Sequence, residues 1–359
     1  MRKIILLIFA FCSVLSQAQE KDSTKKKFFF WDAYAEFYYN HDFNKPAGSL
    51  RPSFIYNHKK TNTLSTNLAF LKAGYNNQKF RIAVAGMLGD YGKYNLAAEP
   101  DFWQHVLELN AGIKISKTKD LWLDIGVMPS HIGFESAIGG DAFTLSRSLV
   151  ADNSPYLNTG AALSYLTPNK QLKLSFLLLN GWQTITNNLN NNPKPAAQIT
   201  YMPDEANTFN YSTFFGKTNL GTTTSFRTYH NLYWQFKGEG FNFTAGLDLG
   251  TQDVGNTSSF WAIPTVVYQQ TVNKKLKTAI RAEYMYDPDN VVSNTFYTGG
   301  SGAKVFGFSW NADYAFNKWS MLRAETRFLR SGNRIFLKEL TAVKNNNNFT
   351  IALIIRKPR

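Results

Sequence analysis

The chain has 359 residues and a formal net charge of +14, and its 18% of charged residues lies below the roughly 25% of an ordinary soluble domain. Its 15% of aromatic residues argues against intrinsic disorder, because disordered chains are poor in aromatic side chains. Beyond the N-terminus, no stretch reaches the ~18 uninterrupted apolar residues that a membrane-spanning helix needs. The composition therefore excludes a disordered chain and a bundle of membrane-spanning helices.

The first residues have the features of an export signal. A basic start is followed by an apolar stretch, Ile4 to Leu15, and by small residues shortly before Gln19. The only cysteine of the chain, Cys12, lies in this segment, so we expect no disulfide or thiol chemistry in the exported protein. The predicted organisation is a cleaved signal peptide (1–18), a short periplasmic tail (19–27) and one folded domain (28–359).

Apolar residues alternate with small or polar residues along almost the whole remaining chain. From Phe241 to Leu249, for example, apolar residues at every second position oppose Asn, Thr, Gly and Asp. A period of two is the signature of a β-strand. We predict sixteen strands, at residues 28–40, 61–74, 79–90, 104–115, 120–130, 156–166, 171–182, 196–202, 208–217, 225–237, 240–251, 259–271, 275–286, 304–316, 319–330 and 348–356.

Alternation alone fits both a soluble β-sandwich, whose apolar faces point into a core, and a membrane barrel, whose apolar face points to lipid. Here the other face is largely Gly, Ala, Ser, Thr and Asn, instead of the Lys and Glu of a water-exposed sheet. Outer-membrane barrels have short periplasmic turns and longer outer loops. Short links alternate here with long ones at residues 41–60, 91–103, 131–155, 183–195, 287–303 and 331–347.

We therefore predict an all-β fold, a transmembrane antiparallel up-and-down β-barrel of about sixteen strands, with a secreted soluble β protein as the alternative. Charged strand residues are expected to face inward, because Arg or Lys on the lipid face costs about 2–4 kcal/mol at the midplane. They either form a channel lining that attracts anions or neutralise one another and stiffen the wall. The candidate pore-lining residues are Asp32, Glu36, Arg81, Glu108, Lys114, Asp124, Asp248, Arg281, Glu283, Asp313, Arg323, Glu325 and Arg327.

The segment 131–155 is the long link that we expect to fold inward and narrow the channel, with a lid on the surface as the alternative. The asparagine-rich stretches 187–192 and 345–348 are expected in solvated outer loops. None of the five histidines has the spacing of a metal site or a catalytic triad, so we expect no enzyme activity, metal or cofactor. The candidate constriction residues in the inward segment are Glu135, Asp141, Arg147 and Asp152.

Four motifs lie close together in the middle of the chain, at Met128–Ser136, Ser146–Leu149, Ser154–Tyr165 and Leu179–Gln183. This block resembles the OmpL-like family of β-barrel porins. The resemblance implies a porin-like barrel in the outer membrane, with no established substrate and no catalytic residues.

The favoured hypothesis is a porin-like channel through which small hydrophilic solutes diffuse passively, with a preference for anions. The alternative is an outer-membrane barrel that acts as an adhesin or structural anchor, with its lumen plugged by the segment 131–155. The expected partners are outer-membrane lipid and lipopolysaccharide, small hydrophilic solutes and the barrel-assembly machinery. Nucleic acid is not expected, because no compact Lys/Arg cluster accompanies stacking aromatics in one short module.

Overall fold

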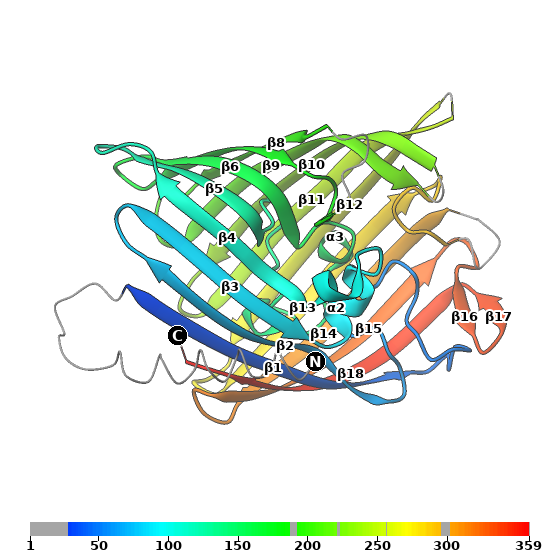
Figure 1. Cartoon of the computed structure of the whole chain (residues 1–359). Coiled ribbons are helices and arrows are strands. Elements are labelled where there is room, and N and C mark those ends of the chain that lie inside the picture. Colours follow the sequence, from blue (N-terminus) through cyan, green and yellow to red (C-terminus); the bar gives the residue numbers. More distant parts are fainter. Residues whose placement is uncertain (1–27, 187–191, 221–222, 256, 296–301, 359) are drawn as a thin grey trace.

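The strands form one closed barrel in the computed structural model (Figure 1). The structure describes residues 28–186, 192–220, 223–255, 257–295 and 302–358, so the predicted signal peptide and periplasmic tail lie outside the described residues. The barrel contains sixteen strands within this described part, all paired antiparallel, and β1 closes the ring by pairing with β18. The predicted fold class is thus confirmed, and a sandwich of two stacked sheets is wrong.

Each barrel strand pairs with its neighbours in chain order, except that β15 pairs with β18 across a small hairpin. The strands are β1 (Phe29–Asp42), β2 (Leu64–Asn76), β3 (Phe80–Leu88), β4 (Val106–Lys114), β5 (Asp120–Pro129), β6 (Leu157–Leu166), β7 (Leu172–Leu179), β8 (Lys194–Tyr201), β9 (Asn207–Leu220), β10 (Thr223–Lys237), β11 (Phe241–Val254), β12 (Thr257–Thr271), β13 (Leu276–Asp287), β14 (Ala303–Ala315), β15 (Ser320–Ser331) and β18 (Asn345–Arg356).

The remaining elements belong to the connections at one end of the barrel. They are β16 (Phe336–Lys338) and β17 (Thr341–Val343), the helices α2 (Asp90–Asn95) and α3 (Leu149–Asp152), and the 3₁₀-helices η2 (Asp101–His105) and η3 (Gly139–Asp141). None of the helices in the described residues is long and apolar enough to cross a membrane. The end that carries these long connections is the outer end if both chain termini are periplasmic, and we use that orientation below.

The second asparagine-rich stretch does not lie in an outer loop, as the sequence led us to expect. Asn345–Asn348 form the first residues of β18, and Asn346 and Asn348 are buried inside the barrel. The side-chain amide of Asn346 donates to both carboxylate oxygens of Asp42 on β1, at 3.0 and 2.9 Å. Amides can therefore replace apolar side chains at these positions, because neighbouring strands supply hydrogen-bond partners. Of the other stretch, residues 187–191 lie outside the described residues.

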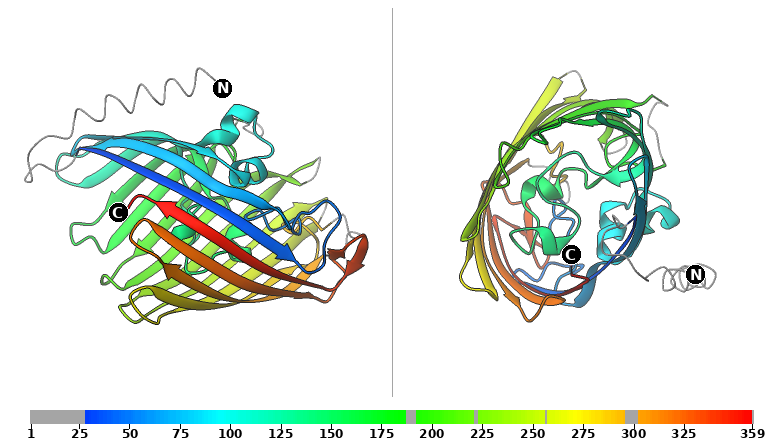
Figure 2. Two further views of the ribbon diagram at one scale, coloured as in Figure 1. Left: turned by 90° about the horizontal axis from the view of Figure 1, so that it is seen from below. Right: turned by 90° about the vertical axis from the view of Figure 1, so that its left-hand side faces the viewer.

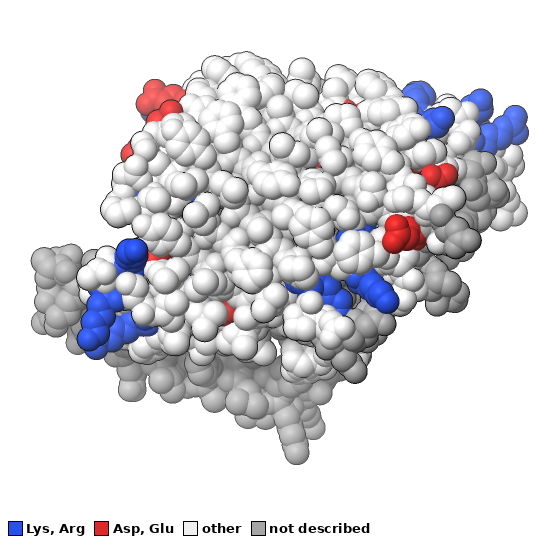
Figure 3. Space-filling model, turned by 90° about the horizontal axis from the view of Figure 1, so that it is seen from above, with Lys and Arg blue, Asp and Glu red and all other residues white. Residues whose placement is uncertain are grey.

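The two faces of the wall differ as a membrane barrel requires. On β13, Ile280 on the outer face is 46% exposed, whereas its neighbour Arg281 on the inner face is fully buried. Most of the wall seen in Figure 3 is uncharged, and most of the charged side chains in that view lie toward its two ends. Exposed aromatic side chains surround the periplasmic end, where a membrane–water interface favours them. They include Phe29, Trp31, Phe80, Tyr201, Phe209, Trp234, Phe241, Tyr268, Tyr314, Phe316 and Trp319.

We expect Val84→Arg, on the outer face of β3, to lower the free energy of unfolding by about 2–4 kcal/mol, because the guanidinium would face acyl chains near the midplane. The matched control is Val272→Arg in the periplasmic turn after β12, where the expected cost is about 0–1 kcal/mol. Denaturant unfolding in lipid vesicles measures both values. Equal costs at the two valines would contradict the assignment of this face to lipid.

Candidate functional site

The connection between β5 and β6 crosses the inside of the barrel instead of covering its mouth, as the end-on view in Figure 2 shows. We call its residues 130–156 the inner loop. Near its start, the carbonyl of His131 accepts hydrogen bonds from Gln198 on β8 and Ser212 on β9, at 2.8 and 2.6 Å. Further along, the backbone N–H of Gly140 donates to the Tyr34 hydroxyl on β1 at 2.9 Å. The inner loop thus contacts opposite sides of the wall.

Four charged residues on β13 and β15 form a buried cluster against this loop. Arg281 lies 2.8 Å from Glu325 and 3.3 Å from Glu283, and Arg327 lies 2.5 Å from Glu283. All four side chains are buried. Because breaking a buried ion pair leaves an uncompensated charge, loss of one partner from such a cluster is expensive, about 3–5 kcal/mol.

The same cluster both accepts hydrogen bonds from the backbone of the inner loop and donates hydrogen bonds to it. The Glu325 and Glu283 carboxylates accept the backbone N–H groups of Ser146 and Leu149, at 2.5 and 2.7 Å. The Arg281 guanidinium donates to the carbonyl of Ser146 at 2.7 Å. Buried backbone groups almost always have a hydrogen-bond partner. Here the wall side chains provide the partners that regular secondary structure would otherwise supply.

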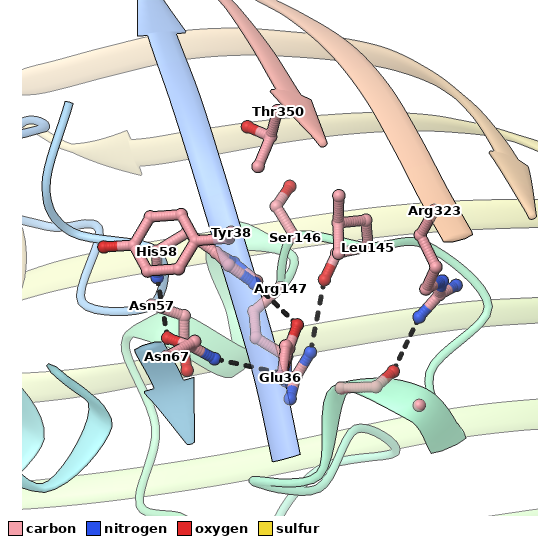
Figure 4. A network of polar contacts seen from close by, with 12 residues as sticks. Glu36, Tyr38, Asn57, His58, Asn67, Leu145, Ser146, Arg147, Arg323 and Thr350 are labelled. Atoms are coloured by element: carbon pink, nitrogen blue, oxygen red, sulfur yellow. Dashed lines mark hydrogen bonds and ion pairs between the residues drawn. The ribbon is translucent and has the colours of Figure 1, made fainter. Parts of the chain in front are cut away.

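Arg323 forms a second anchor for the inner loop (Figure 4). Arg323 on β15 pairs with Asp313 on β14 at 2.7 Å, and it donates to the carbonyls of Gly139 and Ala142 at 2.6 and 3.0 Å. Guanidinium groups suit this task because their five N–H donors can serve a carboxylate and carbonyls together. The short helix η3 is therefore held against the wall near β15.

The charged residues of the inner loop mainly stabilise the loop itself. Arg147 donates to the carbonyls of residues 136 and 137, each at 2.8 Å, and Glu135 accepts the hydroxyl of Ser148 at 2.7 Å. Burial raises the pKa of Glu135, and the guanidinium groups of Arg281 and Arg147 oppose that shift. Asp141 instead reaches the wall, 2.7 Å from Arg356.

The first outer connection, residues 43–63, also folds into the barrel. His58 lies 2.8 Å from the Glu36 carboxylate on β1, and its backbone N–H donates to the Asn67 side chain at 3.0 Å (Figure 4). Asn57 donates to Asp152 of the inner loop at 2.7 Å. The two loops are thus bonded to each other as well as to the wall.

Apolar side chains pack together at the outer end of the lumen. They come from both loops, from the connections after β13 and β15, and from the wall. We call this the outer apolar cluster, and its fully or nearly fully buried members include Phe54, Ile55, Leu149, Val150, Met285, Val291, Val305, Leu329, Ile335 and Phe336. The outer half of the lumen is therefore packed like a protein core.

Ion pairs on the inner face near the periplasmic end are more accessible to water. Lys72 lies 2.6 Å from Glu108, Arg81 lies 2.5 Å from Asp124, and Lys114 lies 3.5 Å from Asp120. The Arg81 guanidinium also stacks on the ring of Trp122, 4.4 Å from its centroid. This end of the lumen is charged and accessible to water.

The candidate residues from the sequence thus fall into three groups. Glu36, Arg281, Glu283, Asp313, Arg323, Glu325 and Arg327 are buried against the two inward loops, and Asp248 is buried with Tyr229 and Asn231. The third group lies near the periplasmic end and consists of Asp32 and the residues of the water-accessible ion pairs, Arg81, Glu108, Lys114 and Asp124. The register partner of Asp32 there is Lys72. Arg281 pairs with Glu283 on its own strand, whereas Arg323 pairs with Asp313 on the neighbouring strand rather than with Glu325.

Several residues that hold the loops were not singled out by sequence reasoning. The Asn311 side chain accepts the backbone N–H of Leu145 at 2.9 Å, and Gln269 donates to the carbonyl of Phe143 at 3.0 Å. Neutral amides do not stand out in the sequence, because they carry no charge. The buried Phe54 and Ile55 could have been recognised, because two adjacent large apolar residues are unusual in a solvated loop.

A closed antiparallel barrel with an apolar outer face, a charged inner face and an outer loop folded inside defines an outer-membrane β-barrel of the porin type. More specifically, the chain belongs to the OmpL-like family described as "Putative beta-barrel porin-2, OmpL-like", whose model matches residues 29–356. A search among curated proteins finds no similar sequence.

Solved structures of outer-membrane proteins share this fold at low sequence identity. OmpT of Vibrio cholerae, an outer membrane protein, has a TM-score of 0.57 at 13% identity, covering 94% of this chain and 100% of its own. The anion-selective porin from Comamonas acidovorans has a TM-score of 0.59 at 8% identity, with coverages of 92% and 99%. Salmonella typhi OmpF, in complex with daunomycin, has a TM-score of 0.59 at 13% identity, with coverages of 92% and 97%.

We expect Arg281→Met to loosen the inner loop and lower the free energy of unfolding by about 3–5 kcal/mol, because Glu325 and the loop carbonyls lose a buried donor. Trypsin should then cleave after Arg147, which is fully buried in the wild type. Mass spectrometry of the digest detects that cut. The control is Arg330→Met, an exposed position on β15. Unchanged resistance after Arg147 in Arg281→Met would contradict the proposed anchoring.

The docking of residues 43–63 should depend on pH through Lys59. Burial lowers the pKa of Lys59 from its ordinary value of 10.5 to about 7, while its ammonium group donates to the carbonyls of Pro52 and Ile55 at 2.7 and 2.8 Å. Between these two pH values the unfolded chain binds the proton and the folded chain does not, so the free energy of unfolding rises with pH. Unfolding curves should show this rise in the wild type but not in Lys59→Met. Parallel pH profiles would contradict it.

Proposed function

We propose that this protein is an outer-membrane channel for small hydrophilic solutes, with a passage restricted by the inner loop. The observation that carries the proposal is the inside of the closed barrel, where charged wall residues bind the backbone of a crossing loop. A sixteen-strand barrel is wide enough for an aqueous lumen, and selectivity in such pores comes from charged rings and constrictions. Membership of a porin family supports the same conclusion.

A preference for anions belongs to this proposal, and the accessible ion pairs support it. The Arg81 side chain is 37% exposed and its partner Asp124 is 10% exposed. Lys72 is likewise more exposed than Glu108, at 24% against 12%, and Lys173 on the same part of the wall is exposed. At the periplasmic rim the anion is the more exposed partner, since Lys114 is 25% exposed and Asp120 is 46% exposed. A solute inside the lumen therefore meets more positive than negative surface.

The proposal extends to the route and surroundings of the protein. We infer export through residues 1–18, insertion by the barrel-assembly machinery, and contact of the apolar outer wall with outer-membrane lipid and lipopolysaccharide. The basic N-terminus and the aromatic residues around the periplasmic end support these inferences.

A second candidate function is an adhesin or structural anchor with a plugged lumen. The outer apolar cluster favours it, because apolar side chains from four connections pack where an open channel would hold water. The two candidates differ in one measurable property, the passage of ions.

Purified protein in a planar bilayer should give discrete conductance steps if the first candidate holds, whereas a silent bilayer would favour the second. In asymmetric KCl, the combined variant Lys114→Glu and Lys173→Glu should lower the anion-to-cation permeability ratio by at least about twofold, because both cations face the lumen. Lys338→Glu on the outer hairpin β16–β17 is the control. An unchanged reversal potential in the double variant would contradict the anion preference.

A further inference from the structure

Arg51, in the first inward loop, has a buried guanidinium group without a protein partner. Its side chain is 3% exposed, and none of its three nitrogens has a hydrogen-bond partner. Only its backbone is fixed, through the N–H that donates to the carbonyl of Lys59 at 2.9 Å. Buried polar groups nearly always find a partner, and a guanidinium presents five donors.

The charged groups that act on Arg51 do not supply that partner. They are Arg327, Asp152, Glu325 and Asp42, and burial together with Arg327 lowers the pKa of Arg51 to about 10. No carboxylate oxygen lies within ion-pair distance of Arg51 among the described residues.

Each of the three carboxylates is already bound to other groups. Asp42 accepts from the Asn346 side chain and from the backbone N–H of Asn44, at 2.9 and 2.8 Å. Glu325 accepts from Arg281 and from the backbone of the inner loop. Asp152 accepts from Asn57 through one oxygen. The second oxygen of Asp152 has no partner and still does not reach Arg51.

We propose that Arg51 holds a small inorganic anion of the size of chloride or bromide inside the outer half of the barrel. An anion in contact with its guanidinium group satisfies the donors of Arg51 and offsets the repulsion from Arg327, which is itself paired with Glu283. The tight enclosure of Arg51 limits the site to a small ion. This role requires no ion flow through the barrel, so it stands apart from the proposed channel function.

The direct test is a crystal structure of the full chain grown in sodium bromide. We expect an anomalous difference peak in contact with the Arg51 guanidinium, absent from Arg51→Met and retained in Arg334→Met, which alters an exposed arginine of an outer loop. An ordered water without anomalous signal, or a direct Arg51–Asp152 ion pair, would overturn the proposal. Bromide found only at exposed lysines would overturn it as well.

A second readout uses thermal unfolding in detergent micelles at constant ionic strength. A ligand that binds only the folded state raises Tm with its concentration. Replacing sodium gluconate by sodium bromide should raise the Tm of the wild type by about 2–4 °C for each tenfold increase above saturation. Arg51→Met should show no such dependence, and Arg334→Met should follow the wild type. Equal bromide dependence in all three proteins would contradict an anion at Arg51.

Discussion

The inside of this barrel depends on hydrogen bonds between charged wall side chains and the backbone of the inner loop. Arg281 and Arg323 donate to loop carbonyls, and Glu283 and Glu325 accept loop N–H groups. A buried loop needs partners for its backbone, and a buried charge needs a partner for its donors or lone pairs. The wall side chains supply partners for the loop backbone, and the loop backbone supplies partners for the buried charges. The loop and the charged wall are therefore stable together inside the barrel.

This arrangement divides the lumen into unlike parts. The outer apolar cluster lies near the loops' outer end, the buried ion pairs lie beside the inner loop, and water-accessible ion pairs such as Arg81–Asp124 lie near the periplasmic end. The closed barrel leaves no unpaired sheet edge, as contact of the outer wall with lipid requires. The two candidate functions differ in whether ions can pass the part that the loops occupy.

Much of the barrel was predictable because a period of two is a local property of the sequence. All sixteen strands were found. The candidate charged residues were assigned to the inner face from the cost of placing a charge in lipid. The hydrogen-bond and ion-pair partners of the inward side chains were not predictable in the same way. Asn346 bonds to Asp42 across the closing pair of strands, and His58 meets Glu36 only because residues 43–63 fold inward. These contacts depend on register and loop packing, which no local pattern encodes.

Amide hydrogen exchange of the protein in lipid vesicles tests most directly whether the inner loop is bound to the wall. The backbone N–H groups of Leu145, Ser146 and Leu149 donate to Asn311, Glu325 and Glu283, although they lie outside the sheet. The account predicts that these three amides exchange as slowly as amides within the barrel strands. Exchange at the rate of an unbonded, solvated loop would contradict it.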